Sequence, residues 1–184
     1  KLVVTVLVAV ASACTNPAGP GPGLNLSDAG LCRSCEGKVA VWSLLTTAET
    51  GLTAALPPRA LNVAYRSDGS GTTFSLANHL STVCTASTSV FQTDQAFTTV
   101  VANFGGVKSG WLGASGNPGV VNAINANPGA IGYAESANLK STPTATNTKV
   151  AKVNGFDPYA NLPATLTFNS VLLDNVIVGR NANG

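Results

Sequence analysis

The sequence predicts an α/β domain, because strand and helix patterns alternate through the middle of the chain. Apolar residues alternate over 61–65 as in a strand, and a loop rich in Gly, Ser and Thr then leads into helical spacing that ends at Cys84. A second pair follows, with a helix pattern over 116–126 and a short strand pattern over 131–135. The 184 residues are 45% hydrophobic and 10% charged, which suits a buried core and argues against disorder. We expect one domain over residues 1–184.

The N-terminal segment, residues 1–13, has two interpretations. A positive residue, a dozen mostly apolar residues and a small-residue run before Cys14 are typical of a signal peptide with a lipoprotein-type cleavage site. The high Val content favours a buried strand instead, and about 13 residues are too few to span a bilayer as a helix. We expect a terminal strand here, and another one or two over 165–178, where β-branched and apolar residues recur.

Between these ends, turn and cap residues mark the remaining elements. The Pro- and Gly-rich stretch 17–23 is a connector. Ser27 is a suitable N-cap for a short helix over 28–35, and Gly37 is a suitable stop for it. Pro118 fits the first turn of the helix over 116–126.

The charge pattern excludes two kinds of partner. The net charge is +2, and the Lys and Arg residues are scattered singly. A nucleic-acid or anionic-membrane surface needs clustered basic residues, so we expect neither partner. Asn, Thr, Ser and Gly must supply the solvated surface, which is common in secreted proteins. We expect a secreted, periplasmic or extracellular protein without a membrane span.

Four cysteines, Cys14, Cys32, Cys35 and Cys84, leave three possibilities open. An even number in a charge-poor chain favours disulfides in an oxidising compartment. Free thiols are the second possibility. A metal site is the third, although Cys14 and Cys84 are not arranged as the second close pair that a zinc site normally has.

The segment YRSDGSGTT, residues 65–73, has the chemistry of an oxyanion site. A helix N-terminus presents unpaired N–H groups and a partial positive charge, and Gly69 and Gly71 let a ligand approach the backbone. Ser70 and Thr72 add hydroxyl donors, and Arg66 adds a guanidinium fork that matches a tetrahedral oxyanion. The alternative is a hydroxyl-rich helix cap without a ligand. The spacing does not match a Walker A loop, a dinucleotide-binding loop or a nucleophile elbow.

An enzymatic function has little support in the sequence. His79 is the single histidine, lies within a predicted helix, and is expected to be a partly exposed helix residue. No carboxylate pair has acid–base spacing, and no nucleophile–base pair or metal cluster is visible. We therefore expect no catalytic residue, no metal and no cofactor, and a small phosphatase is the weakest of the functional hypotheses.

Three ordered blocks resemble the PstS-type periplasmic phosphate-binding proteins, and the placing of Cys32 and Cys84 resembles their DING branch. The blocks lie within about residues 24–139: Leu24-Asn-Leu-Ser-Asp28 with Leu31, Gly37-Lys38 and Trp42; Val63 to Phe74; and Gly116 to Glu135. The resemblance implies one lobe, the second, of a type II periplasmic-binding-protein fold, to which terminal strands are added. In that family a first lobe supplies further phosphate contacts.

Carried over by position, the resemblance implies that Arg66, Ser70, Gly71 and Thr72 contact inorganic phosphate or a similar oxyanion. Asp68 would pair with Arg66. A Cys32–Cys84 disulfide is also implied, which would leave Cys14 and Cys35 for a second bridge.

Two functions follow as expectations. The first is a secreted phosphate-binding domain of the PstS and DING type. The alternative is a secreted structural subunit with a vestigial anion loop, which self-associates through residues 2–10 and 165–178 into an extracellular filament. Apolar, unpaired strand edges at the two ends would recruit the partner strands.

Overall fold

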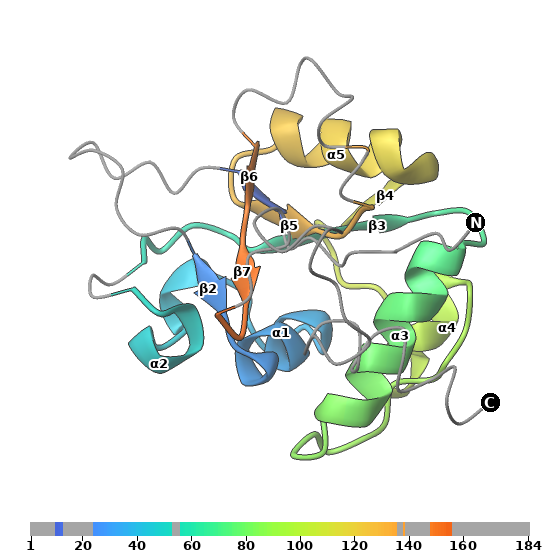
Figure 1. Ribbon diagram of the computed structural model, residues 1–184, viewed down its shortest axis with the longest axis horizontal. Helices are drawn as coiled ribbons and strands as arrows, with labels where there is room; N and C mark the ends of the chain where they lie inside the picture. The colour runs from blue at the N-terminus through green and yellow to red at the C-terminus, as the bar shows by residue number, and fades with distance from the viewer. Residues whose placement is uncertain (1–9, 13–23, 53–55, 136–137, 139–147, 156–184) are drawn as a thin grey trace, which may run out of the picture.

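The structure, a computed structural model, describes residues 10–12, 24–52, 56–135, 138 and 148–155 (Figure 1). Its centre is a five-stranded sheet in the order β4-β3-β5-β1-β6. The strands are β1 (Val10–Ser12), β3 (Asn62–Arg66), β4 (Leu112–Ala114), β5 (Ala130–Gly132) and β6 (Thr148–Val150). β3 is parallel to β4 and β5, whereas β1 is antiparallel to β5 and β6. The predicted α/β class is confirmed.

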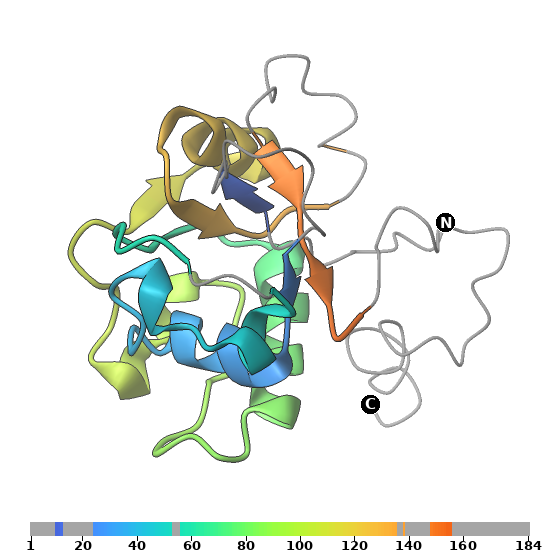
Figure 2. The same ribbon diagram turned by 90° about the vertical axis from the view of Figure 1, so that its left-hand side faces the viewer.

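A second, two-stranded sheet lies beside the first. β2 (Asn25–Leu26) pairs in parallel with β7 (Lys152–Val153), which follows β6 along the chain (Figure 2). The turn after β7 also contacts this region, because Asn154 donates from Nδ2 to Asp28 at 2.7 Å.

Helices cover both faces of the main sheet (Figure 1). α5 (Gly116–Ala126) packs on one face, and α1 (Asp28–Cys35), α3 (Gly71–Val83) and α4 (Phe97–Val100) lie on the other. Three shorter turns complete the described elements: η1 (Trp42–Leu44), α2 (Thr47–Thr50) and η2 (Ala102–Phe104).

The alternation of side chains along β3 explains this layered arrangement. Val63 belongs to the core beneath the sheet, and Tyr65 stacks on Phe97 with ring centroids 4.9 Å apart. The intervening Ala64 pairs with Gly132 of β5 on the face that α5 covers. A Cβ on Gly132 would meet the Ala64 carbonyl oxygen of the neighbouring strand at 2.5 Å and Ile124 Cδ1 of α5 at 2.8 Å. Small residues on this face therefore set how near the helix can approach the sheet.

The two predicted cap signals hold. Ser27 caps α1 by accepting from the Gly30 N–H at 3.2 Å, and Gly37 ends the helix with a φ of +76°. α5 begins and ends at the predicted residues. β3 is shifted by one residue from the predicted strand, and β5 covers 130–132 because the chain leaves the sheet before Tyr133.

Several elements were not predicted, and part of the prediction lies outside the described residues. α2 has a full capping box, in which Thr46 and Glu49 bond each other's backbone N–H, and this signal is visible in the sequence. The segment 91–104, α4 and η2 included, and strands β4, β6 and β7 carried no pattern that we used. Of the expected terminal strands, β1 accounts for residues 10–12, whereas 1–9, 13 and 165–178 lie outside the described residues. Within the described part of the chain, no helix has the length and apolar character needed to cross a lipid bilayer.

Candidate functional site

The candidate site lies at the carboxyl end of β3, the middle strand of the parallel β4-β3-β5 group. β3 ends at Arg66 and α3 begins at Gly71, so four residues connect them. The Ser67 N–H donates to the Ala114 carbonyl at 3.0 Å, which ties the loop to the end of β4. Ligands of open α/β sheets bind outside the carboxyl ends of the strands, and this loop occupies that position.

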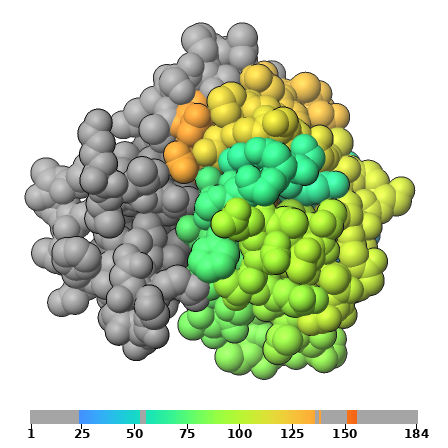
Figure 3. All heavy atoms as spheres, turned by 90° about the vertical axis from the view of Figure 1, so that its right-hand side faces the viewer, coloured from blue at the N-terminus to red at the C-terminus, as the bar shows by residue number. Residues whose placement is uncertain are grey.

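Space-filling atoms show that the loop reaches the surface. In Figure 3 the blue-green atoms of the β3 region and the loop lie between the yellow atoms of the α5 region and the yellow-green atoms of residues 85–105. The loop is thus accessible from outside at the junction of these segments.

Ser70 is the N-cap of α3. It has extended backbone, and its Oγ accepts the N–H groups of Thr72 at 3.1 Å and Thr73 at 3.4 Å. The Gly71 N–H has no partner among the described residues, and a Cβ on Gly71 would meet nothing within 4 Å. The start of α3 therefore keeps a free backbone donor and open space beside it.

Arg66 is held by two side chains. Asp68 accepts from Nε at 2.8 Å and from Nη2 at 2.5 Å, which makes the predicted ion pair bidentate. Asn117, in the first turn of α5, accepts from Nη1 at 3.2 Å. Three of the five guanidinium N–H groups are used, and two remain for a ligand. The side chain of Arg66 is 12% exposed, so its position is constrained.

Asp68 joins three parts of the structure. Its Oδ1 also accepts the Gly116 N–H at 3.1 Å, so the carboxylate joins the loop to the start of α5. The Arg66 guanidinium holds the pKa of Asp68 well below its usual range, and the hydrogen bonds to Asp68 raise the pKa of Arg66. Both shifts favour the charged forms of the pair.

Tyr133 lies beneath the loop and was not predicted as a site residue. Its hydroxyl accepts the Arg66 backbone N–H at 3.2 Å and shares a 2.7 Å hydrogen bond with Thr73 Oγ1. The side chain is 3% exposed, and burial raises its pKa to about 12, so the phenol stays protonated. One hydroxyl thus links the end of β3 to the first turn of α3.

Glu135 follows Tyr133 and contributes a second negative charge near the loop. Thr72 donates from Oγ1 to Glu135 Oε1 at 3.3 Å. Asn117, Tyr133 and Glu135 all belong to the third sequence block that carried the resemblance, and that was the signal available for finding them. No periodic or chemical pattern in the sequence places them beside Arg66.

The prediction for His79 was wrong. The side chain is 2% exposed, and its Nε2 lies 3.0 Å from Asp28 Oδ1 on α1. The face of α3 that carries it packs against α1, so the histidine forms a buried tie between the two helices. That hydrogen bond lowers the pKa of Asp28.

The cysteines give one confirmation and one correction. Cys32 and Cys84 form the expected disulfide, with Cα atoms 5.6 Å apart, which ties α1 to the end of α3. The expected Cys14–Cys35 bridge is wrong, because Cys35 is a free buried thiol, and Cys14 itself lies outside the described residues. Burial raises the pKa of Cys35 to about 12.

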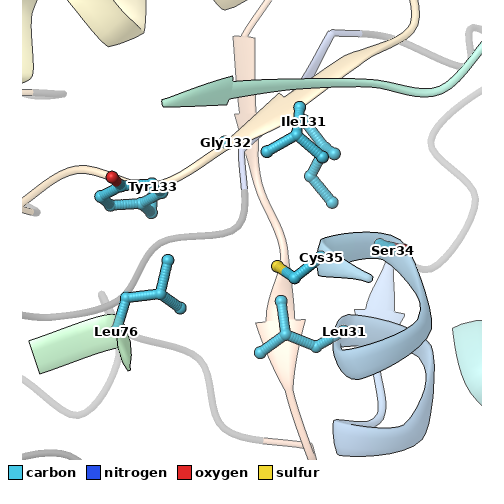
Figure 4. A pocket seen from close by; sticks show the side chains of 8 residues that line it. Leu31, Ser34, Cys35, Leu76, Ile131, Gly132 and Tyr133 are labelled. Atoms are coloured by element: carbon cyan, nitrogen blue, oxygen red, sulfur yellow. The ribbon is translucent and has the colours of Figure 1, made fainter. Parts of the chain in front are cut away.

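Cys35 points from α1 into the core because it lies on the buried face of that helix (Figure 4). It lines an apolar cavity of about 20 Å³ between α1, α3 and β5, with Leu31, Leu76 and Ile131 among its neighbours. Among the residues with described positions, no group of three or more His, Cys, Asp or Glu side chains could hold a metal ion.

Comparisons with known proteins agree with the predicted resemblance to PstS-type and DING-type phosphate-binding proteins. A family profile described as a PBP superfamily domain matches residues 1–173. The chain is 32% identical over 152 residues to alkaline phosphatase L of Pseudomonas aeruginosa. That match covers 81% of this chain and 36% of the relative. It is 37% identical over 103 residues to the phosphate-binding protein PstS of Xylella fastidiosa, over 55% of this chain and 25% of that protein.

A solved structure is similar over most of the chain. It is a high affinity periplasmic phosphate-binding protein, PfluDING, bound with phosphate, with 29% identity and a TM-score of 0.63. The match covers 86% of this chain and 40% of that one. The chain therefore spans less than half the length of these relatives, as a single lobe would.

Proposed function

Because the chain belongs to the PBP superfamily, we propose that it binds inorganic phosphate or a similar tetrahedral oxyanion at the start of α3. The proposed contacts come from Arg66, Ser70, Gly71 and Thr72. The observation that carries the proposal is the pairing of a constrained guanidinium, which has two free N–H groups, with an open helix N-terminus.

Each group has a separate role. Arg66 supplies charge and directed N–H donors, and Asp68 keeps the guanidinium in one orientation. Gly71 supplies a backbone N–H where no side chain obstructs the ligand. Ser70 accepts two backbone N–H groups at its Oγ, so its hydroxyl hydrogen remains available for an anion oxygen.

The donors all come from one end of one sheet, which limits the affinity that they provide together. A charge-assisted hydrogen bond contributes about 1.5–3 kcal/mol to the binding free energy, and roughly 1.4 kcal/mol corresponds to a tenfold change in affinity. In the family that the sequence resembles, a first lobe adds contacts from the opposite side of the phosphate. We therefore do not propose that this lobe alone binds phosphate with the high affinity for which PfluDING is named.

Isothermal titration with inorganic phosphate tests the proposal. Arg66→Ala should abolish the binding heat. Arg33→Ala is the control: it removes the same charge from α1, where Arg33 pairs with Glu49 of α2 away from the loop, and it should leave the binding heat unchanged. Equal heats from the wild type and Arg66→Ala would contradict the proposed site.

Binding without catalysis is the simpler proposal, although one relative is named an alkaline phosphatase. The described loop holds its acidic group, Asp68, in an ion pair, and Tyr133 stays protonated, so neither is set up as a base. Release of p-nitrophenol from its phosphate ester, abolished in Arg66→Ala, would overturn this part of the proposal.

The filament alternative concerns the terminal strands. β1 pairs with β5 on one side and β6 on the other, so Val10–Ser12 has no free edge for a partner strand. This observation favours the phosphate proposal over strand exchange at residues 10–12. Sedimentation velocity tests the alternative. A single species whose sedimentation coefficient does not change with protein concentration would argue against self-association through the remaining terminal residues.

We also propose that the chain works outside the cytoplasm. The solved relative is named as periplasmic, and the Cys32–Cys84 disulfide suits an oxidising compartment. Mass spectrometry of the chain from a periplasmic or culture fraction, before and after reduction, would test both points.

A further inference from the structure

Asn154 and Gly155 form the turn that follows β7, and the backbone is left-handed at both positions. Asn154 has a φ of +50° and Gly155 a φ of +81°. Asn154 is the only residue other than glycine with a positive φ in the part of the chain that the structure describes. Both residues are exposed, and a Cβ on Gly155 would meet nothing within 4 Å. Water therefore reaches this Asn-Gly pair.

Two hydrogen bonds hold the Asn154 side chain against Asp28, the first residue of α1, beside the lower end of β7 in Figure 1. Asn154 donates from Nδ2 to Asp28 Oδ2 at 2.7 Å, and its Oδ1 accepts the Asp28 N–H at 3.1 Å. Together these two hydrogen bonds form the Asp28 clasp. The Gly155 N–H is also engaged, because it donates to Asn25 Oδ1 on β2 at 2.6 Å. The turn is thus tied to both α1 and β2.

An Asn-Gly pair contains both partners of a cyclisation reaction. The Gly155 backbone nitrogen can attack the carbonyl carbon of the Asn154 side chain, and the new C–N bond closes a five-membered succinimide. The attacking nitrogen gives up its proton, and the side-chain nitrogen takes up a proton and leaves as ammonia. Water then opens the ring at either carbonyl and yields aspartate or isoaspartate. Glycine favours the attack because it has no Cβ beside the nucleophile.

The folded protein keeps the two reacting groups apart. The Asn154 side chain must leave the Asp28 clasp before its carbonyl carbon can meet the Gly155 nitrogen, so the reaction requires a local opening of the turn. Loss of the two clasp hydrogen bonds makes the open turn rarer by about tenfold or more. The clasp therefore slows the cyclisation.

Deamidation would also reverse the chemistry of the clasp. The donor Nδ2 becomes a carboxylate oxygen that faces the Asp28 carboxylate, and two like charges at this separation repel each other. Asp28 has little freedom to turn away, because its Oδ1 lies 3.0 Å from Nε2 of His79, which is 2% exposed. The repulsion therefore acts on the exposed turn, which must separate from α1.

We propose that Asn154-Gly155 is a deamidation site that the Asp28 clasp protects, and that conversion to aspartate or isoaspartate releases the turn after β7 from α1. The inference is independent of the proposed oxyanion site, since neither residue of the pair contacts the loop between β3 and α3. The reaction needs water alone as the second reactant.

Peptide mapping by mass spectrometry measures the conversion during incubation of the full chain at mildly alkaline pH. The map separates this pair from Asn183-Gly184, the other Asn-Gly pair of the sequence. Asn154 should convert at least about tenfold more slowly in the folded wild type than in the same chain unfolded in guanidinium chloride. Folded Asp28→Ala should convert within a few-fold of the unfolded chain, roughly the gain expected when the clasp is absent. Equal rates in the folded and unfolded wild type, or an unchanged rate in Asp28→Ala, would overturn the protection.

The variant Asn154→Asp reproduces the aspartate product and tests the release. Aspartate adopts the left-handed conformation about as readily as asparagine does, so a lower urea midpoint reports the added charge. The same substitution made in an Asp28→Asn background should lower the midpoint much less, because the amide introduced there can donate to the new carboxylate. Equal losses in the two backgrounds would overturn the release. If Asp28→Ala is poorly folded by circular dichroism, Asp28→Ser replaces it in the rate measurement with the same expected result, because its side chain is too short to reach Asn154.

Discussion

Tyr133→Phe removes a single oxygen from the support beneath the anion loop. That oxygen accepts the Arg66 N–H at 3.2 Å and shares a 2.7 Å hydrogen bond with Thr73 Oγ1, and the ring is 3% exposed. Each lost hydrogen bond costs about 0.5–1.5 kcal/mol, and a buried group left without a partner adds to this cost, so we expect a loss of about 2–3 kcal/mol in the free energy of unfolding.

Urea unfolding followed by circular dichroism measures this loss as a lower midpoint with an unchanged slope. Tyr65→Phe is the matched control, because Tyr65 stacks on Phe97 but its hydroxyl has no hydrogen bond among the described residues. The control should change stability by less than about 0.5 kcal/mol. Equal midpoints for the two variants would refute the view that Tyr133 holds the end of β3 and the start of α3 together.

Three further predictions concern the framework of the lobe. Replacement of Cys32 and Cys84 by Ala should lower the free energy of unfolding by about 4 kcal/mol, because the disulfide closes a loop with a sequence separation of 52. Cys35→Ala is the control, since it leaves that loop closed. The urea midpoints of the two variants should therefore differ widely. Gly132→Ala should lower the free energy of unfolding by about 1–3 kcal/mol in the same assay, because the added methyl group would meet the Ala64 carbonyl oxygen on β3 at 2.5 Å and Ile124 Cδ1 on α5 at 2.8 Å; an unchanged midpoint would mean that β3 and α5 do not pack against Gly132 as described. Folding lowers the pKa of Asp28 from 3.8, so the stability that this carboxylate contributes is complete above about pH 4 and is lost as the pH falls. The difference in the free energy of unfolding between the wild type and Asp28→Asn should therefore shrink in acid, and a constant difference would contradict the prediction.

The sequence predicted those parts of the fold that depend on local signals. Ser27 and Gly37 delimit α1, Pro118 lies in the first turn of α5, and the alternation around Val63 gives β3 within one residue. These signals act through neighbours along the chain, so they are visible without the fold. The capping box of α2 is of the same kind and was overlooked.

What the sequence could not give depends on contacts between distant residues. His79 seemed suited to solvent from its place in a helix, but the pairing of α3 with α1 buries it against Asp28, 51 residues away. Cys35 could not be assigned a partner by counting, because the direction in which it leaves α1 decides whether it meets another thiol or the core.

The candidate site divides in the same way. The Arg66 and Asp68 pair is two residues apart and was expected, whereas Asn117 and Tyr133 reach Arg66 from 51 and 67 residues away. Sheet order brings these residues together, since β3 lies between β4 and β5. Only the resemblance of the third sequence block pointed toward them.

The most direct test of the central claim is a phosphate titration followed by ¹H–¹⁵N correlation spectra of the protein. If the anion is held at the start of α3, the largest shift should appear at the backbone amide of Gly71, with smaller ones at Thr72 and Thr73, and all should vanish in Arg66→Ala. Shifts that saturate elsewhere in the spectrum, or an absence of shifts at Gly71 while phosphate binds, would contradict the claim that this loop is an oxyanion site.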